Sequence, residues 1–249
     1  MTNTMKTKLS FLLFPALLFG FTNLVLAQDA ATILKKADEV MYSAKDQSSK
    51  MKIILIDKQD REKTREANVL QKGDEMRLFR FTAPASQSGI AFLSLPDDIM
   101  YIYMPAFGKE RRIASHVKNQ SFAGTDFSYD DMEAKPFSEK YIPKLIRTEE
   151  RYFVLELIPK QDVKSDYSKI IMHVNKSNYC PEGFEFYNRG DIKIKEGEYS
   201  FEKVGDYWSP KEIMMKDLKK NHTTKMITSE IQYDTGLSDD EFTVRKLKQ

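Results

Sequence analysis

The chain of 249 residues carries 39 Lys and Arg against 37 Asp and Glu, with both signs interspersed along its length. This near-neutral balance offers no electrostatic basis for binding nucleic acid, or for bulk attraction to anionic lipid. The single cysteine, Cys180, excludes an intramolecular disulfide, so a hydrophobic core must hold the fold together.

A secretory signal peptide is predicted over residues 1–27. Lys6 and Lys8 form a short basic region, and an apolar stretch follows from Leu9. Val25 and Ala27 occupy the small-residue positions that a signal peptidase reads, which predicts cleavage after Ala27. The alternative is an uncleaved anchor helix, since an apolar segment of about 18 residues can span a bilayer. The V-L-A end of the segment favours removal.

The mature chain, residues 28–249, is predicted to form a single domain, because no shift in composition marks a second one. Losing residues 1–27 removes two lysines and no acids, which leaves 37 basic against 37 acidic side chains. The expected product is therefore a formally neutral, soluble protein that works outside the cytoplasm.

An amphipathic helix is predicted to open the mature chain. Apolar side chains recur at the spacing that lines one helical face, namely Ile33, Leu34, Ala37, Val40 and Met41. Asp29 stands where it can cap the start of this helix. A short helix of this kind must lie on an apolar surface.

After Lys50 the pattern changes to short segments with strand character, broken by turn residues. The predicted strands are Met51–Asp57, Glu66–Gln71, Glu75–Phe81, Ile90–Leu95, Ile99–Met104, Tyr152–Ile158, Lys169–Val174, Phe184–Tyr187, Asp191–Phe201, Glu212–Leu218 and Thr224–Tyr233. Their regular recurrence is typical of an antiparallel sheet in a sandwich or barrel. No alternation of strands with helices is visible, which argues against a parallel α/β fold.

The predicted strands differ in how many faces they bury. Ile227, Ile231 and Tyr233 share one parity, which indicates a half-buried strand with one face in water. In contrast, Ile99–Met104 and Tyr152–Ile158 are apolar on both parities. Such strands are covered on both faces, either because a helix lies across them or because they line an internal cavity.

Residues 115–143 contain few strand signals and many aromatic side chains. Ser128 begins the run S-Y-D-D-M-E, and Asp131 follows three residues later, which predicts the acidic first turn of a short helix. A long insert in a compact β domain is usually a lid or a binding loop, or else a poorly ordered excursion.

The residues that carry catalysis or bind metals do not form a recognisable pattern. His116, His173 and His222 are scattered, without the spacing of a metal site. No G-x-S-x-G, Walker or G-x-G-x-x-G motif occurs. Cys180 and His173 could form a nucleophile and base, but no signature supports the pair, and an inert cysteine is the better interpretation. No catalytic residue, cofactor or metal is therefore predicted.

Two motifs, in order, carry a family resemblance. The first is Y-x-P-x-x-G-x-x-R-R-I, formed by Tyr103, Pro105, Gly108, Arg111, Arg112 and Ile113. The second is G-[ST]-D-[FL]-[ST]-Y-x-D, formed by Gly124, Thr125, Asp126, Phe127, Ser128, Tyr129 and Asp131. Together with the closing L-S-D-D-E-F-T of Leu237–Thr243, they make the sequence resemble the bacterial outer-membrane lipoprotein-sorting, or LolA-like, proteins. The resemblance covers nearly all of the mature chain and is strong in its middle third.

The resemblance implies a mainly β fold with helices, of the α+β class. The expected architecture is a curved, incompletely closed antiparallel β-barrel with helices covering its concave side. The implied function is that of a periplasmic carrier, not an enzyme, which shelters lipoprotein acyl chains or a free lipid in an apolar cavity. Burying an acyl chain yields about 0.8 kcal/mol per CH₂, so no catalytic group is needed. The implied partners are lipid or lipoprotein acyl chains, with an inner-membrane transporter or an outer-membrane acceptor.

Candidate site residues follow from this interpretation. The predicted cavity walls are Met76, Leu78, Phe92, Met100, Ile102, Phe153, Leu155, Phe184 and Phe186. The predicted lid comprises Leu34, Val40 and Met41, with Arg111, Arg112, Gly124, Thr125, Asp126, Phe127, Tyr129 and Asp131 of the two motifs orienting the insert. Arg77 and Arg80 are candidates for the lid-locking arginine of the founding carriers, although outward-facing charges are the simpler interpretation.

Two alternatives remain open from sequence. The first is an envelope interaction protein that binds a partner protein through its curved sheet, which would need no internal cavity. The second is an enzyme that acts on a lipid, which would require Asp126, His116 and Arg111 to converge in a pocket.

Overall fold

The computed structural model describes residues 20–249, without the side chains of residues 20–28. The basic region and most of the apolar stretch of the predicted signal peptide lie outside these residues. Among the helices of residues 20–249, none has the length and apolar character needed to cross a bilayer.

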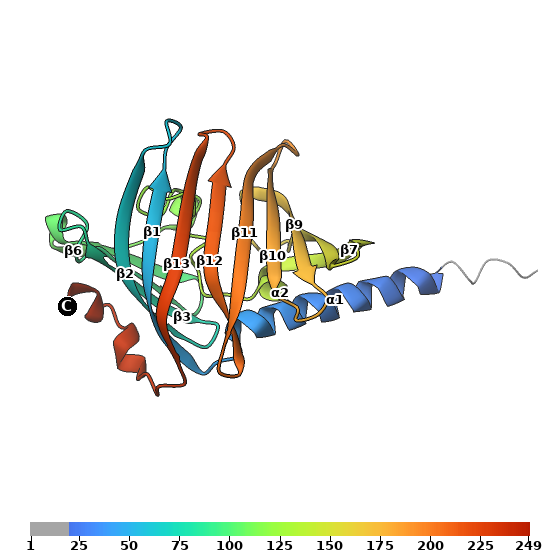
Figure 1. The fold of residues 1–249 in the computed structure, drawn as a ribbon, viewed down its shortest axis with the longest axis horizontal. Coiled ribbons are helices and arrows are strands. Elements are labelled where there is room, and N and C mark those ends of the chain that lie inside the picture. The colour runs from blue at the N-terminus through green and yellow to red at the C-terminus, as the bar shows by residue number, and fades with distance from the viewer. Residues whose placement is uncertain (1–19) are drawn as a thin grey trace, which may run out of the picture.

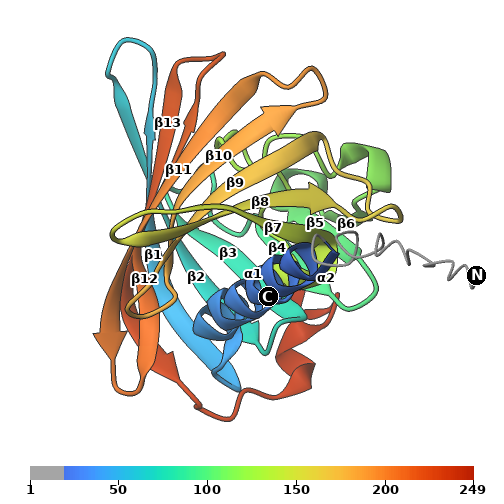
Figure 2. The same cartoon turned by 90° about the vertical axis from the view of Figure 1, so that its right-hand side faces the viewer.

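A single antiparallel sheet of 13 strands forms the body of the molecule (Figures 1 and 2). Its strands are β1 (Asp46–Ile56), β2 (Glu62–Lys72), β3 (Met76–Ala83), β4 (Ala91–Leu95), β5 (Ile99–Met104), β6 (Lys109–Arg112), β7 (Tyr141–Thr148), β8 (Tyr152–Pro159), β9 (Tyr167–Asn175), β10 (Pro181–Asn188), β11 (Lys193–Val204), β12 (Tyr207–Asp217) and β13 (His222–Tyr233). Their order is β6-β5-β4-β3-β2-β1-β13-β12-β11-β10-β9-β8-β7. Strands β6 and β7 end the sheet without pairing to each other, so the curved sheet stays open. The predicted mainly β, incompletely closed barrel is confirmed.

The helix α1 (Gly20–Tyr42) lies across the concave side of the sheet (Figure 2). Its buried face carries Ala30, Ile33, Leu34 and Ala37, which pack into the main core as the apolar spacing predicts. Asp29 lies inside the helix and not at its start, because the helix extends back to Gly20. The predicted helical face is thus correct and the predicted cap is wrong.

The short helix α2 (Phe137–Lys140) is fixed to α1 by one carboxylate. Asp38 of α1 accepts hydrogen bonds from the backbone N–H groups of Phe137 at 2.8 Å and Ser138 at 2.9 Å. These N–H groups have no partner inside the helix, so Asp38 satisfies them from outside. The contact joins α1, which carries the predicted lid residues, to α2. The segment that precedes α2, residues 113–136, is called the insert below.

The hydrophobic core has two parts, on the two faces of the sheet. The concave part includes Phe79, Phe92 and Phe122, and Phe122 forms T-shaped aromatic pairs with each of the other two. The convex part lies against the C-terminal segment, residues 237–249, where Phe242 and Leu247 are buried. This segment contains the 3-10 helices Asp239–Phe242 and Lys246–Lys248.

The two-sided burial of β5 is explained by this division. Met100 and Ile102 face the concave core, whereas Tyr101 and Tyr103 pack against the convex part under the C-terminal segment. One face is therefore covered by a distant segment of the chain, which the strand's own sequence could not reveal.

Three local expectations differ from the structure. Strands β6 and β7 were not predicted, because the first is a charged run and the second contains Pro143. No helix follows Ser128: the residues form turns, although Ser128 and Asp131 do exchange the two capping hydrogen bonds, at 2.8 and 3.0 Å. In β13 a bulge at Glu230, with φ 50°, changes the parity of the strand. Ile231 therefore faces the concave side, opposite to Ile227.

Candidate functional site

A cavity of about 170 Å³ lies between the concave side of the sheet, the end of α1 and the insert. Its apolar wall comes from elements that are far apart in the chain: Val40 and Met41 of α1, Phe79 of β3, Phe127 of the insert, Phe186 of β10 and Trp208 of β12. Ile213 and Met226 continue this wall on β12 and β13. The cavity can therefore surround an apolar group with apolar side chains.

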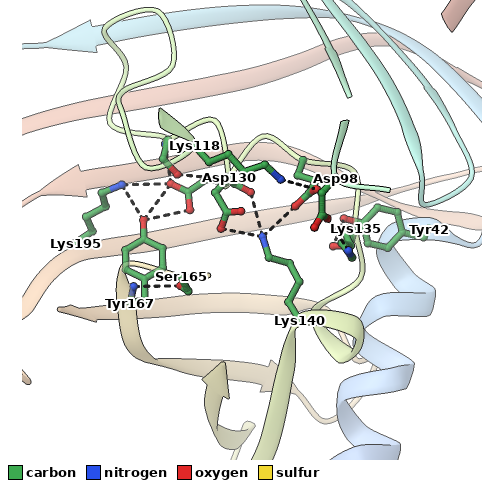
Figure 3. A network of polar contacts seen from close by, with 12 residues as sticks. Tyr42, Asp98, Lys118, Asp130, Lys135, Lys140, Ser165, Tyr167 and Lys195 are labelled. Carbon is green, nitrogen blue, oxygen red and sulfur yellow. Dashed lines mark hydrogen bonds and ion pairs between the residues drawn. The ribbon is translucent and has the colours of Figure 1, made fainter. Parts of the chain in front are cut away.

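The cavity lining also includes polar residues, among them Asp130, Asp131, Glu133 and Lys140, which belong to a network of polar contacts (Figure 3). Asp131 of the insert accepts a hydrogen bond from Tyr167 Oη at 3.1 Å and pairs with Lys195 Nζ at 3.2 Å. Burial raises the pKa of Asp131, but Lys195 and the hydrogen bonds from Ser128 outweigh burial and hold the pKa below its usual value. Burial and the adjacent carboxylate raise the pKa of Tyr167 well above its usual value, so its hydroxyl remains a donor.

Lys140, at the end of α2, is the centre of a second group of charges. Its ammonium lies 2.9 Å from Asp130 and 3.3 Å from Glu133, and Lys118 approaches Glu133 at 3.5 Å. Burial lowers the pKa of Lys140, but the two carboxylates reverse this effect and raise it. Burial also raises the pKa of Glu133, against the opposing influence of Lys140. These pairs fix the insert against α2.

Arg77 projects from β3 into the cavity and contacts the insert. It donates to Gln71 Oε1 from Nε at 3.1 Å and from Nη2 at 2.7 Å, and to the carbonyl oxygen of Met132 from Nη1 at 3.0 Å. Gln71 and Arg77 are cross-strand partners. Of the two candidate lid-locking arginines, Arg77 therefore faces inward, whereas Arg80 binds the carbonyl oxygens of Lys246 and Leu247 on the convex side.

The second sequence motif fastens the insert to the sheet. The buried Asp126 carboxylate accepts hydrogen bonds from Thr224 Oγ1 and from His222 Nδ1, each at 2.7 Å. Thr125 Oγ1 donates to the carbonyl oxygen of Phe122 at 2.7 Å. Gly124 adopts φ 77°, a left-handed conformation that favours glycine. In this motif Phe127 lines the cavity, and Tyr129 packs on Phe92 and Phe122.

The residues of the first motif lie elsewhere. Arg111 and Arg112 are exposed on β6, and the Arg111 guanidinium stacks 5.1 Å from the centre of the Phe107 ring. His116 is also exposed, whereas Asp126 is buried against His222 and Thr224. The three residues that a lipid-modifying enzyme would bring together share no contact in residues 20–249.

The predicted cavity residues occupy three places. Phe186 lines the cavity. Phe92, Met100, Ile102, Leu155 and Phe184 are buried in the concave core, and Phe153 is packed on it and stacked on Tyr179. Met76 and Leu78 lie on the convex face against the C-terminal segment, because the inward parity of β3 belongs to Arg77 and Phe79. Of the predicted lid, Val40 and Met41 line the cavity and Leu34 is core.

Sequence reasoning missed much of the lining, including Phe79, Ile213 and Met226 in the apolar wall and Tyr207 and Trp208 at the start of β12. The predicted strand began only at Glu212, because Pro210 interrupts the apolar pattern. Trp208, the only tryptophan of the chain, was the signal that could have shown that this segment is packed, since tryptophan side chains are mostly buried in folded proteins. Sequence reasoning named Arg77 as a candidate but favoured an outward orientation, whereas Arg77 lines the cavity.

Comparisons with known proteins agree with this geometry. A domain assigned to an outer membrane lipoprotein-sorting protein from Vibrio parahaemolyticus is 28% identical, with a TM-score of 0.83 over 90% of this chain and 100% of that one. A LolA superfamily protein from Nitrosomonas europaea is 27% identical, with a TM-score of 0.74 over 87% and 98% of the two chains. A DUF1329 family protein from Desulfovibrio piger shares the fold at 23% identity, with a TM-score of 0.84 over 89% and 99%.

The sequence comparisons are sparser. Among curated proteins none matches this chain. A family model described as "Uncharacterized protein" matches residues 73–249, and the chain belongs to that family. The structural neighbours match over nearly their whole length, so the chain has the fold of the LolA-like, outer-membrane lipoprotein-sorting proteins.

Proposed function

We propose that this protein is a periplasmic carrier that shelters lipoprotein acyl chains, or a free lipid, during transfer between the membranes of the cell envelope. The observation that supports the proposal is the cavity on the concave side of the sheet, apolar over most of its wall and lined by α1 and the insert as well as by the sheet. The lipoprotein-sorting fold of the neighbours points to the same class of cargo.

The lining of the cavity indicates how loading would work. Each CH₂ transferred from water stabilises the complex by about 0.8 kcal/mol, which can offset the cost of moving the lid aside. Val40 and Met41 line the cavity from α1, so this end of the helix is the part that would move aside.

The cellular setting of the proposal rests on the sequence of residues 1–27. Removal of that segment after Ala27 would release a mature chain of residues 28–249 into the periplasm. Loading from an inner-membrane transporter and delivery to an outer-membrane acceptor would complete the cycle. Transfer of this kind requires differential binding and no chemical step.

The test is to export the full chain in a bacterium, purify the mature protein from the periplasm, and analyse its lipid extract and intact complex by mass spectrometry. A stoichiometric acylated species in both measurements would support the carrier and name its cargo. A protein that is free of lipid and also ignores added lipid would contradict it, and would favour binding of a partner protein through the curved sheet.

A further inference from the structure

Arg77 differs from the lysines that line the cavity, because Lys135 and Lys140 form ion pairs and Arg77 forms none within residues 20–249. The polar network around the insert contains four carboxylates, Asp98, Asp130, Asp131 and Glu133. It also contains four ammonium groups, those of Lys118, Lys135, Lys140 and Lys195, each within 3.5 Å of one of these acids. The network is therefore neutral by itself.

Arg77 takes no part in this compensation. In residues 20–249 no carboxylate oxygen lies within ion-pair distance of its guanidinium, and its partners are a side-chain amide and a backbone carbonyl. Asp38, a further buried carboxylate on α1, is committed to the backbone N–H groups of α2. A partly buried cation with neutral partners only is costly, and an anion placed beside it would recover that cost.

The guanidinium also has donors to spare. Of its five N–H groups, the contacts with Gln71 and Met132 use three, which leaves two on a side chain that lines the cavity. A carboxylate or phosphate group matches a guanidinium better than a water molecule does, because it carries the opposite charge and several acceptor oxygens.

Aromatic and apolar side chains line the cavity beside Arg77. Tyr42 and Tyr199, which line the same cavity, are close enough for the positive charge of Arg77 to oppose the rise that burial causes in their pKa. Phe79 is next on the same inward face of β3, and Trp208 and Ile213 lie in the apolar wall. The cavity thus combines a cation that forms no ion pair with a surface suited to hydrocarbon.

We propose that the cavity selects an amphiphile with a single anionic head, a carboxylate or a phosphate ester, whose head binds Arg77 and whose tail lies on the aromatic wall. This inference rests on the proposed carrier function and narrows its cargo. The bond from Arg77 to Met132 links the head-group position to the insert, so binding of the head and closure of the lid involve the same side chain.

The test uses dodecanoate and dodecyl phosphate against uncharged dodecanol, each below its micellar concentration, with inorganic phosphate alone as a fourth ligand. Binding is followed by the fluorescence of Trp208, the only tryptophan and a lining residue, and by native mass spectrometry. In the wild type we expect the anions to bind about tenfold more tightly than dodecanol. In Arg77→Gln we expect this preference to disappear while dodecanol binds as before.

Two variants serve as controls. Arg77→Lys keeps the charge without the guanidinium and should retain part of the preference. Arg147→Gln removes an exposed arginine that pairs with Glu149 outside the cavity, and should change nothing. Retained dodecanol binding in Arg77→Gln shows in the same sample that the variant is folded.

The possible outcomes separate this inference from the carrier proposal. Equal binding of dodecanol and the anions by the wild type, or a preference that survives in Arg77→Gln, overturns the role of Arg77 and leaves the carrier intact. Failure to bind any of the amphiphiles overturns both. Inorganic phosphate bound as tightly as dodecyl phosphate would identify a site for a free anion and overturn the selection of an amphiphile.

Discussion

Asp126 of the insert and His222 at the start of β13 are 96 residues apart in sequence, yet the Asp126 carboxylate accepts a hydrogen bond from His222 Nδ1 at 2.7 Å. The same carboxylate accepts one from Thr224, which is fully buried. The aspartate of the second motif therefore holds the insert, which lines the cavity, against strand β13 of the sheet.

The first prediction concerns this contact. Asp126→Ala should lower the free energy of unfolding by about 3 kcal/mol, because it leaves the buried Thr224 hydroxyl and His222 without their acceptor. Urea denaturation measures the loss, and amide hydrogen exchange should be fastest in residues 120–135. Glu202→Ala, which removes an exposed ion pair with Lys211, is the control and should cost less than about 0.5 kcal/mol. Equal losses in the two variants would contradict the assignment.

The second prediction concerns acid. The pKa of Asp131 is lower in the folded protein than its unfolded value of about 3.9. Its contribution to stability is therefore complete above that value and is lost as the pH falls through the folded pKa. Asp131→Asn should be less stable than the wild type at neutral pH, and the gap between the two should close below about pH 4. Denaturation curves recorded across this window check it, and a gap independent of pH would rule out the ionic contribution.

The third prediction concerns occupancy of the cavity. Ile213→Trp should fill the apolar wall and abolish lipid retention in native mass spectrometry, at a cost of about 1–3 kcal/mol in stability. Ile227→Trp adds the same side chain on the outer face of β13 and should leave lipid content unchanged. Leu155, although it belongs to a predicted cavity wall, is fully buried in the core and would be a poor site for this test.

The fourth prediction concerns the C-terminal segment. Arg80 donates to the carbonyl oxygens of Lys246 and Leu247, which holds the buried Leu247 against the convex face. Arg80→Gln should release this end of the chain, so that trypsin cleaves at Arg245 well before it cuts the sheet. Arg147→Gln is the matched control, since that arginine is exposed and bonds locally to Glu149. An unchanged digestion pattern would show that apolar packing alone retains the segment.

The fifth prediction concerns Cys180. Burial, aided by the charge of Glu182, raises the pKa of its thiol to about 12, and the side chain is fully buried. Because the thiolate is the reactive form, alkylating reagents should leave the folded protein unmodified at neutral pH and label it only on unfolding. Mass spectrometry of samples alkylated with and without denaturant decides this. Rapid labelling of the native protein would place the thiol at the surface.

The strands were largely predictable because alternation of apolar and polar side chains is a local signal, written in neighbouring residues. Ile99–Met104, which is apolar on both parities, was predicted with its observed bounds from an equally local signal, the turn residues Pro96–Asp98 before it and Pro105 after it. Strand β7 was missed because its proline and its exposed Ile142 hide the alternation. The capping pair of Ser128 and Asp131 was also local and did form, but the turn that it fixes does not continue as a helix.

The amino-acid sequence by itself determined the mainly β architecture, the amphipathic face of α1 and the resemblance to lipoprotein-sorting proteins, since each depends on residues close together in the chain. Only the tertiary structure decided which strand face encloses the cavity. On β3 the covering of the outer face by the C-terminal segment leaves Arg77 and Phe79 facing inward. On β13 the bulge at Glu230 brings Ile231 to the inside. Alternation of apolar and polar residues does not record either effect. A single inserted residue turns the following side chains to the opposite face of the strand, and a distant segment can bury a face that the pattern alone would place in water.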